Sequence, residues 1–90
     1  MITVRIPTVM RQATNGEAVV SLECATVGEA FTALTERFPA LKGQLIDDTG
    51  ALHRFVNVYR NDDDIRYLNQ LGTALHNGDT LSILPAVAGG

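Results

Sequence analysis

The chain has 90 residues, 46% hydrophobic and 19% charged, a composition typical of one folded domain and not of a disordered chain. Its formal net charge is −3 and its seven lysine and arginine residues are scattered, which argues against a nucleic acid or an anionic membrane as partner. With one cysteine, no segment resembling a signal peptide and no apolar run near the ~18 residues of a membrane span, the sequence favours a cytoplasmic protein.

The first quarter of the chain predicts two strands joined by a rather long loop. Apolar and polar residues alternate over residues 2–6, and Pro7 limits this run. A second alternating run covers residues 18–24, with Asn15-Gly16 as a turn signal between the two. Cys24 continues the apolar side of the second run, so we interpret it as a small core residue and not as a sulfur-relay thiol.

A helix is predicted to follow, beginning at Thr26. Thr26 and Glu29 have the spacing of a capping box, in which both side chains satisfy backbone donors at a helix start. Pro39 ends the helix. Its buried stripe follows the helical period and comprises Val27, Ala30, Phe31, Leu34 and Phe38.

The second half predicts three further short strands. Leu41, Leu45 and Ile46 suggest an apolar turn that plugs the core. Strands are then expected over residues 55–59, 65–67 and 81–84, with Leu71 and Leu75 packed beneath a connecting segment and turns at residues 61–64 and 77–79. We interpret Asp62, Asp63 and Asp64 as a solvated turn, and His53 and His76 as surface residues, because neither set has metal-ligand spacing.

This order of elements indicates an α+β fold, a sheet of four to five strands with one main helix on one face. Pattern alone leaves several topologies open. We expect the folded domain to span residues 1–85 and residues 86–90 to form a flexible tail that ends in Gly-Gly.

The C-terminal residues Gly89 and Gly90 make the terminal carboxylate the expected reactive group. Glycine adopts nearly any backbone conformation and fits a channel too narrow for side chains. Fully extended, the segment after Pro85 would reach ~17 Å, enough to enter another protein's active site. We expect Ala86, Val87 and Ala88 to guide this tail, although a frayed, functionless terminus is also compatible with such an ending.

Over its whole length the chain resembles the ubiquitin-like sulfur-carrier family, which includes the ThiS and MoaD carriers. The strongest local match runs from Gly78-Asp79 through the last strand to Leu84-Pro85 and the final Ala-Val-Ala-Gly-Gly. Together with residues 53–59, this ending most resembles the subtype that serves cysteine synthesis, the CysO type. The resemblance implies a β-grasp with a mixed sheet, in which the first and last strands lie parallel and adjacent at the centre.

The resemblance also implies a function as a protein-borne reagent and not as an enzyme. An E1-like adenylyltransferase and sulfurtransferase would adenylate the Gly90 carboxylate with ATP and Mg²⁺ that belong to that enzyme, and sulfur would then replace AMP to give a thiocarboxylate. In the cysteine branch, the thiocarboxylate would react on a pyridoxal-phosphate cysteine synthase of the CysM type, and a JAMM-type metalloprotease would release cysteine. We expect the chain itself to bind no cofactor and no metal.

Three large apolar residues near the ends of strands are candidates for partner docking: Phe55, Tyr59 and Leu84. Alternation permits an exposed position on the open face of the sheet, which would suit an activating enzyme, and equally permits ordinary core packing. Three alternatives to cysteine synthesis remain: a carrier for thiamin or molybdopterin synthesis, a ubiquitin-like modifier of lysines, and an interaction module with an inert tail.

Overall fold

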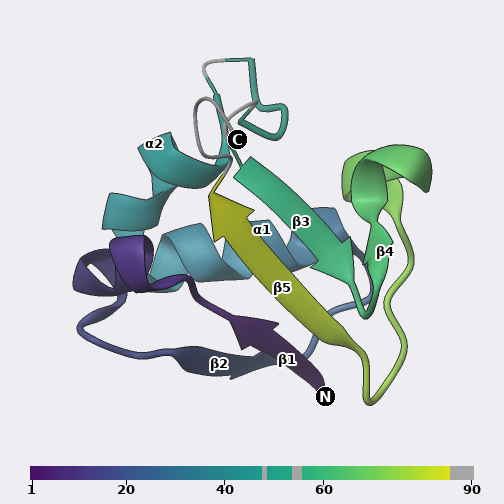
Figure 1. Ribbon diagram of the computed structural model, residues 1–90, viewed down its shortest axis with the longest axis horizontal. Coiled ribbons are helices and arrows are strands. Elements are labelled where there is room, and N and C mark those ends of the chain that lie inside the picture. Colours follow the sequence, from purple (N-terminus) through teal and green to yellow (C-terminus); the bar gives the residue numbers. More distant parts are fainter. Residues whose placement is uncertain (48, 54–55, 86–90) are drawn as a thin grey trace.

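A mixed sheet forms the centre of the fold (Figure 1). The computed structural model describes residues 1–47, 49–53 and 56–85. Within these residues the sheet has the spatial order β2-β1-β5-β3-β4, formed by β1 (Ile2–Arg5), β2 (Val19–Leu22), β3 (Val56–Arg60), β4 (Asp63–Asp64) and β5 (Thr80–Pro85). The parallel pair β1 and β5 lies at the centre, and the other neighbours are antiparallel. The predicted α+β arrangement of a β-grasp is therefore confirmed.

One long helix, α1 (Val27–Arg37), packs behind the sheet in the view of Figure 1. Its predicted start is confirmed, because the Glu29 backbone N–H donates to Thr26 Oγ1 at 3.2 Å. The Glu29 carboxylate in turn accepts from the backbone N–H of Ala25 at 3.1 Å. A short 3-10 helix η2 (Pro39–Leu41) and the helix α2 (Lys42–Leu45) follow directly, so Pro39 ends α1 and starts the next turn as proline favours.

The core lies between α1 and the inner face of the sheet. The whole predicted helix stripe is buried there, with Phe31 only 1% exposed, and so are the plugging residues Leu41 and Leu45. The strands contribute the alternate residues Ile2, Val4, Val20, Leu22, Val56, Val58, Leu81 and Ile83. Because these alternate with residues of higher exposure, the other face of the sheet is open to solvent.

Two short segments differ from the prediction. Residues 8–14 form a 3-10 helix, η1 (Thr8–Thr14), where only a loop was expected. The predicted strand over residues 65–67 is wrong: β4 ends at Asp64, and Ile65–Tyr67 form a 3-10 helix, η3. The Asp64 carboxylate accepts from the backbone N–H of Arg66 at 2.9 Å, and this cap turns the chain away from the ladder.

The turns follow the glycine and asparagine signals. Asn15 and Gly16 after η1 have φ of 56° and 86°, and Gly78 before β5 has φ of 94°. A fourth 3-10 helix, η4 (Gln70–Gly72), lies between η3 and β5 and packs against α1. Leu75 is buried beneath this connection, as predicted, whereas Leu71 is partly buried against the core.

Candidate functional site at the end of the central strands

The parallel pair β1 and β5 fixes where the C-terminal segment leaves the sheet. Because the strands run in the same direction, their C-terminal ends meet at one edge. Pro85 is the last described residue and pairs with Val56 at the start of β3. The predicted reactive and guiding residues, Ala86, Val87, Ala88, Gly89 and Gly90, lie outside the described residues.

Two of the three predicted docking residues lie on the open face, and one of them, Leu84, is next to this edge. Leu84, next to Pro85, is 47% exposed and stands opposite Asn57 of β3. Tyr59 is half-buried and stands opposite Ser82 in the same ladder. Phe55 lies outside the described residues.

The strand register places Tyr59 in a row that crosses the whole sheet. Each member stands opposite the next in the ladder: Val19, Arg5, Ser82, Tyr59 and Asp64. The row begins with the apolar Val19 of β2 and the cationic Arg5 of β1, and it ends with the carboxylate of Asp64 in β4. It gives the open face a polarised surface whose basic end lies on the side of η1.

A groove of about 650 Å³ lies at this basic end, between η1 and the end of β5. Its apolar lining includes Val9, Val19 and Leu84, which are 70%, 52% and 47% exposed, and also Pro85. Arg5 also lines the groove. Apolar side chains this exposed next to a cation are typical of a protein-binding surface.

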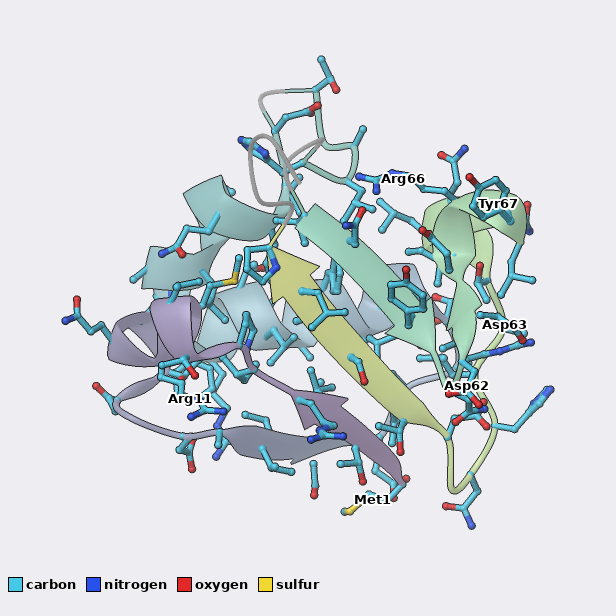
Figure 2. The ribbon with its side chains drawn as sticks, in the orientation of Figure 1. Met1, Arg11, Asp62, Asp63, Arg66 and Tyr67 are labelled. Carbon is cyan, nitrogen blue, oxygen red and sulfur yellow. The ribbon has the colours of Figure 1, made fainter. Side chains whose placement is uncertain are left out.

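Arg11 completes the cationic side of the groove. Its Nε donates to the carbonyl of Ile6 at 3.1 Å, which ties η1 to the end of β1 (Figure 2). Of these groove residues only Leu84 was predicted. The exposure of Val19 was predictable, because it is an apolar residue at an outward position of its strand. Val9 lies in a 3-10 helix that no periodic pattern in the sequence predicted.

Cys24 lies away from this edge, just after β2. It is half-buried and packs against the core. Cys24 is therefore less buried than the prediction of a core residue implied. Burial raises the pKa of the Cys24 thiol, and the carboxylates of Glu29 and Glu23 raise it further, against a smaller lowering by the N-terminal ammonium. A thiol with a raised pKa is mostly protonated at neutral pH and is a weak nucleophile.

The acidic and histidine residues contribute no metal cluster within the part of the chain that the structure describes. Asp62 is in the turn before β4 and is exposed, but Asp63 and Asp64 form β4 itself, so only part of the predicted solvated turn is a turn (Figure 2). His76 is exposed, as predicted. Across residues 1–47, 49–53 and 56–85, no helix is both long and apolar enough to cross a bilayer.

Comparison with known proteins gives matches over nearly the whole chain. The model of the ThiS family matches residues 4–90. The sulfur carrier protein CysO of Mycobacterium tuberculosis is 44% identical over 91 residues, which cover 99% of this chain and 98% of the relative. The small archaeal modifier protein 3 of Haloferax volcanii is 41% identical over 66 residues, covering 73% of this chain and 71% of that protein.

A solved structure agrees with these sequence matches. In the crystal structure of the BexX/CysO complex of Amycolatopsis orientalis, a chain aligns with a TM-score of 0.92 at 46% identity. The alignment covers 100% of both chains.

Proposed function

The chain belongs to the ThiS family and is a non-catalytic sulfur carrier protein of the CysO type, and we propose that its working group is the carboxylate of Gly90. The observation that carries this proposal is the position of β5 beside β1. The strand delivers Pro85 to the edge of the sheet, and only residues 86–90 separate it from the end of the chain. Small side chains in this segment leave the carboxylate accessible to a narrow active site.

Activation of this carboxylate requires a better leaving group than oxide. We propose that an E1-like adenylyltransferase supplies it: a Gly90 oxygen attacks the α-phosphate of ATP, pyrophosphate leaves, and an acyl adenylate forms. Sulfide then attacks the acyl carbon and AMP leaves, which yields the thiocarboxylate. ATP and Mg²⁺ belong to the activating enzyme in this scheme.

Cysteine synthesis is the proposed use of the sulfur. An activated serine loses its leaving group on a pyridoxal-phosphate cysteine synthase to give an aminoacrylate, and the thiocarboxylate sulfur adds to the β-carbon of that aminoacrylate. An acyl shift from sulfur to nitrogen then leaves cysteine amide-linked to Gly90. A JAMM-type metalloprotease hydrolyses that amide and restores the carboxylate. The relatives of the CysO type support this branch over thiamin or molybdopterin synthesis.

The groove and the open face provide the proposed contact with these enzymes. Leu84 and Val9 would bury apolar area against a partner, while Tyr59 flanks Leu84 on the same face. The CysO of Amycolatopsis orientalis was crystallised in complex with BexX, which supports the expectation that such a carrier acts through protein contacts. Residues Ala86, Val87 and Ala88 are proposed to line the partner's entry channel.

The test is the intact mass of the protein after incubation with ATP, Mg²⁺, sulfide and an E1-like adenylyltransferase from the same cell. We expect one oxygen to be replaced by sulfur, and fragmentation to locate the change at Gly90. A variant that lacks Gly90, and one extended beyond it, should remain unmodified and folded. Sulfur incorporation into either variant would exclude Gly90 as the acceptor.

A protein modifier is the second candidate, favoured by the similarity to a small archaeal modifier protein. The same adenylate would then be attacked by a lysine amine, which gives an isopeptide bond in place of a thiocarboxylate. Sulfide-independent conjugates of higher mass in a lysate supplemented with ATP would favour this candidate. Conjugates that require the Gly90 carboxylate would distinguish it from adventitious cross-linking.

A further inference from the structure

The outer edge of β3 is only partly covered by a neighbouring strand. β4 has two residues, Asp63 and Asp64, which pair with Arg60 and Tyr59 at the C-terminal end of β3. In the described part of the chain, no strand pairs with the outer edge of β3 over residues 56–58. Carbonyl groups at such an edge need other partners.

The guanidinium of Arg66 occupies this uncovered edge (Figure 2). Its Nη2 donates to the carbonyl of Val56 at 2.6 Å and to the carbonyl of His53 at 3.3 Å. Its Nη1 donates to the side-chain oxygen of Asn57. The planar fork of a half-buried arginine therefore takes the place of a longer β4 and fixes the start of β3.

The start of β3 in turn holds the end of β5. Val56 stands opposite Pro85, and Asn57 stands opposite Leu84. Proline has no backbone N–H, so Pro85 can donate no ladder hydrogen bond of its own. The position of Pro85, from which the C-terminal segment continues, therefore depends on how firmly Val56 and Asn57 are placed.

From this arrangement we propose that Arg66 is a positioning residue, which holds the start of β3 and thereby fixes the point from which the C-terminal segment leaves. Its effect on sulfur transfer rests on the proposed function of Gly90. A partner that must first order a loosened strand end binds the carrier more weakly, because ordering even one residue opposes association. We expect a roughly fivefold rise in KM for the activating enzyme, with kcat unchanged.

The test compares three variants. Arg66→Met keeps most of the side-chain length and removes all the donors of the fork. Arg66→Lys keeps the charge but not the planar fork, and serves where Arg66→Met is too unstable to purify. Arg60→Met is the matched control, because Arg60, like Arg66, is half-buried. Arg60 belongs to β3 itself and lies at its C-terminal end, where its Nη1 donates to the carbonyl of Ala74 at 3.1 Å.

Two measurements are made on each variant. The first is the amide chemical shift and 15N relaxation of Leu84 and Ala86 in the free carrier, which requires no partner and no activity. The second is the KM and kcat of thiocarboxylate formation with the E1-like enzyme. We expect Arg66→Met to alter both amides and to raise KM, Arg66→Lys to do so less, and Arg60→Met to leave both readouts as in the wild type.

Unchanged Leu84 and Ala86 amides in Arg66→Met would overturn the positioning role, whatever the enzyme assay gives. A rise in KM of equal size in Arg60→Met would also overturn it, because a general loss of stability would then account for the effect. If the wild-type carrier is not thiocarboxylated at all, the proposed function fails, and the amide measurements still decide the role of Arg66.

Discussion

Thr26 shows how one side chain sets the start of an element. Its hydroxyl oxygen accepts a hydrogen bond from the Glu29 backbone N–H, and the Glu29 carboxylate accepts one from the backbone N–H of Ala25. These bonds satisfy donors that have no partner within the helix. Because the spacing of Thr26 and Glu29 is local, this feature was predictable from the sequence, and the structure confirms it.

The change Thr26→Ala is expected to lower the free energy of unfolding by about 1 kcal/mol, because it removes the N-cap. Urea unfolding followed by circular dichroism measures the effect. Thr32→Ala is the control, since Thr32 is an exposed residue in the same helix whose hydroxyl donates to the Gly28 carbonyl at 3.0 Å. An equal loss of stability in both variants would contradict a specific capping role.

Asp79 links the stability of the fold to pH. The backbone N–H of His76 lowers the pKa of this carboxyl most, and the Asn61 side-chain amide lowers it further. A folded-state pKa below the unfolded value of about 3.9 means that the contribution is fully present above that value and is lost as pH falls through the folded pKa. The stabilising contribution of Asp79 should therefore decline as the pH falls below about 4.

Urea unfolding between neutral pH and about pH 3 tests this expectation, since the window spans the unfolded pKa. The variant Asp79→Asn should be less stable at neutral pH and should lose part of the decline toward acid. Asp62→Asn, at an exposed turn position, is the control and should keep the decline. If Asp79→Asn declines as steeply as the wild type, other groups dominate the acid response.

At the scale of elements, prediction succeeded where the pattern is periodic and failed where a side chain competes with the backbone. The α1 stripe and the alternation in β1 and β5 correspond to the buried face. Residues 65–67 have a strand-like composition, yet the Asp64 cap makes them η3. Arg66 also contacts residues 9 to 13 positions away, and such contacts follow from the tertiary arrangement and not from local spacing.

Leu84, near the end of β5, is the residue with which we test the proposed docking of the activating enzyme. Leu84→Ser removes an apolar side chain that is 47% exposed and should change the unfolding free energy by less than about 1 kcal/mol. If the open face meets the activating enzyme, KM for thiocarboxylate formation should rise by about three- to tenfold, as expected for loss of one apolar anchor. Steady-state kinetics with the E1-like enzyme measures this.

Tyr67→Ser is the matched control for Leu84→Ser. Tyr67 is a large exposed side chain, 88% accessible, but it belongs to η3, beyond the edge strand β4 (Figure 2). We expect its removal to leave KM unchanged. A similar rise in KM in both variants would mean that the effect comes from general surface properties. An unchanged KM in both would mean that the activating enzyme contacts another part of the surface.

At the scale of the whole molecule, the fold and the proposed reaction depend on different parts of the chain. The reactive end was predicted from the Gly-Gly ending and the family resemblance, and the sheet topology shows where that end is delivered. The groove beside η1 was not predicted, because it joins Val9, Val19 and Leu84 from three segments. Surfaces of this kind depend on the packing of distant elements, which one sequence does not encode as a local pattern.

The core residues between Ile2 and Ile83 already bury the inner face of the sheet against α1, so we expect the domain not to need residues 86–90 for its stability. We expect a chain that ends at Pro85 to have the same urea midpoint and the same dependence on denaturant as the full chain. Its free energy of unfolding should agree with that of the full chain within about 0.5 kcal/mol. The same variant should accept no sulfur, because it ends in a proline carboxylate without the glycines. A lower midpoint would show instead that residues 86–90 pack on the domain, and the predicted boundary at residue 85 would then be wrong.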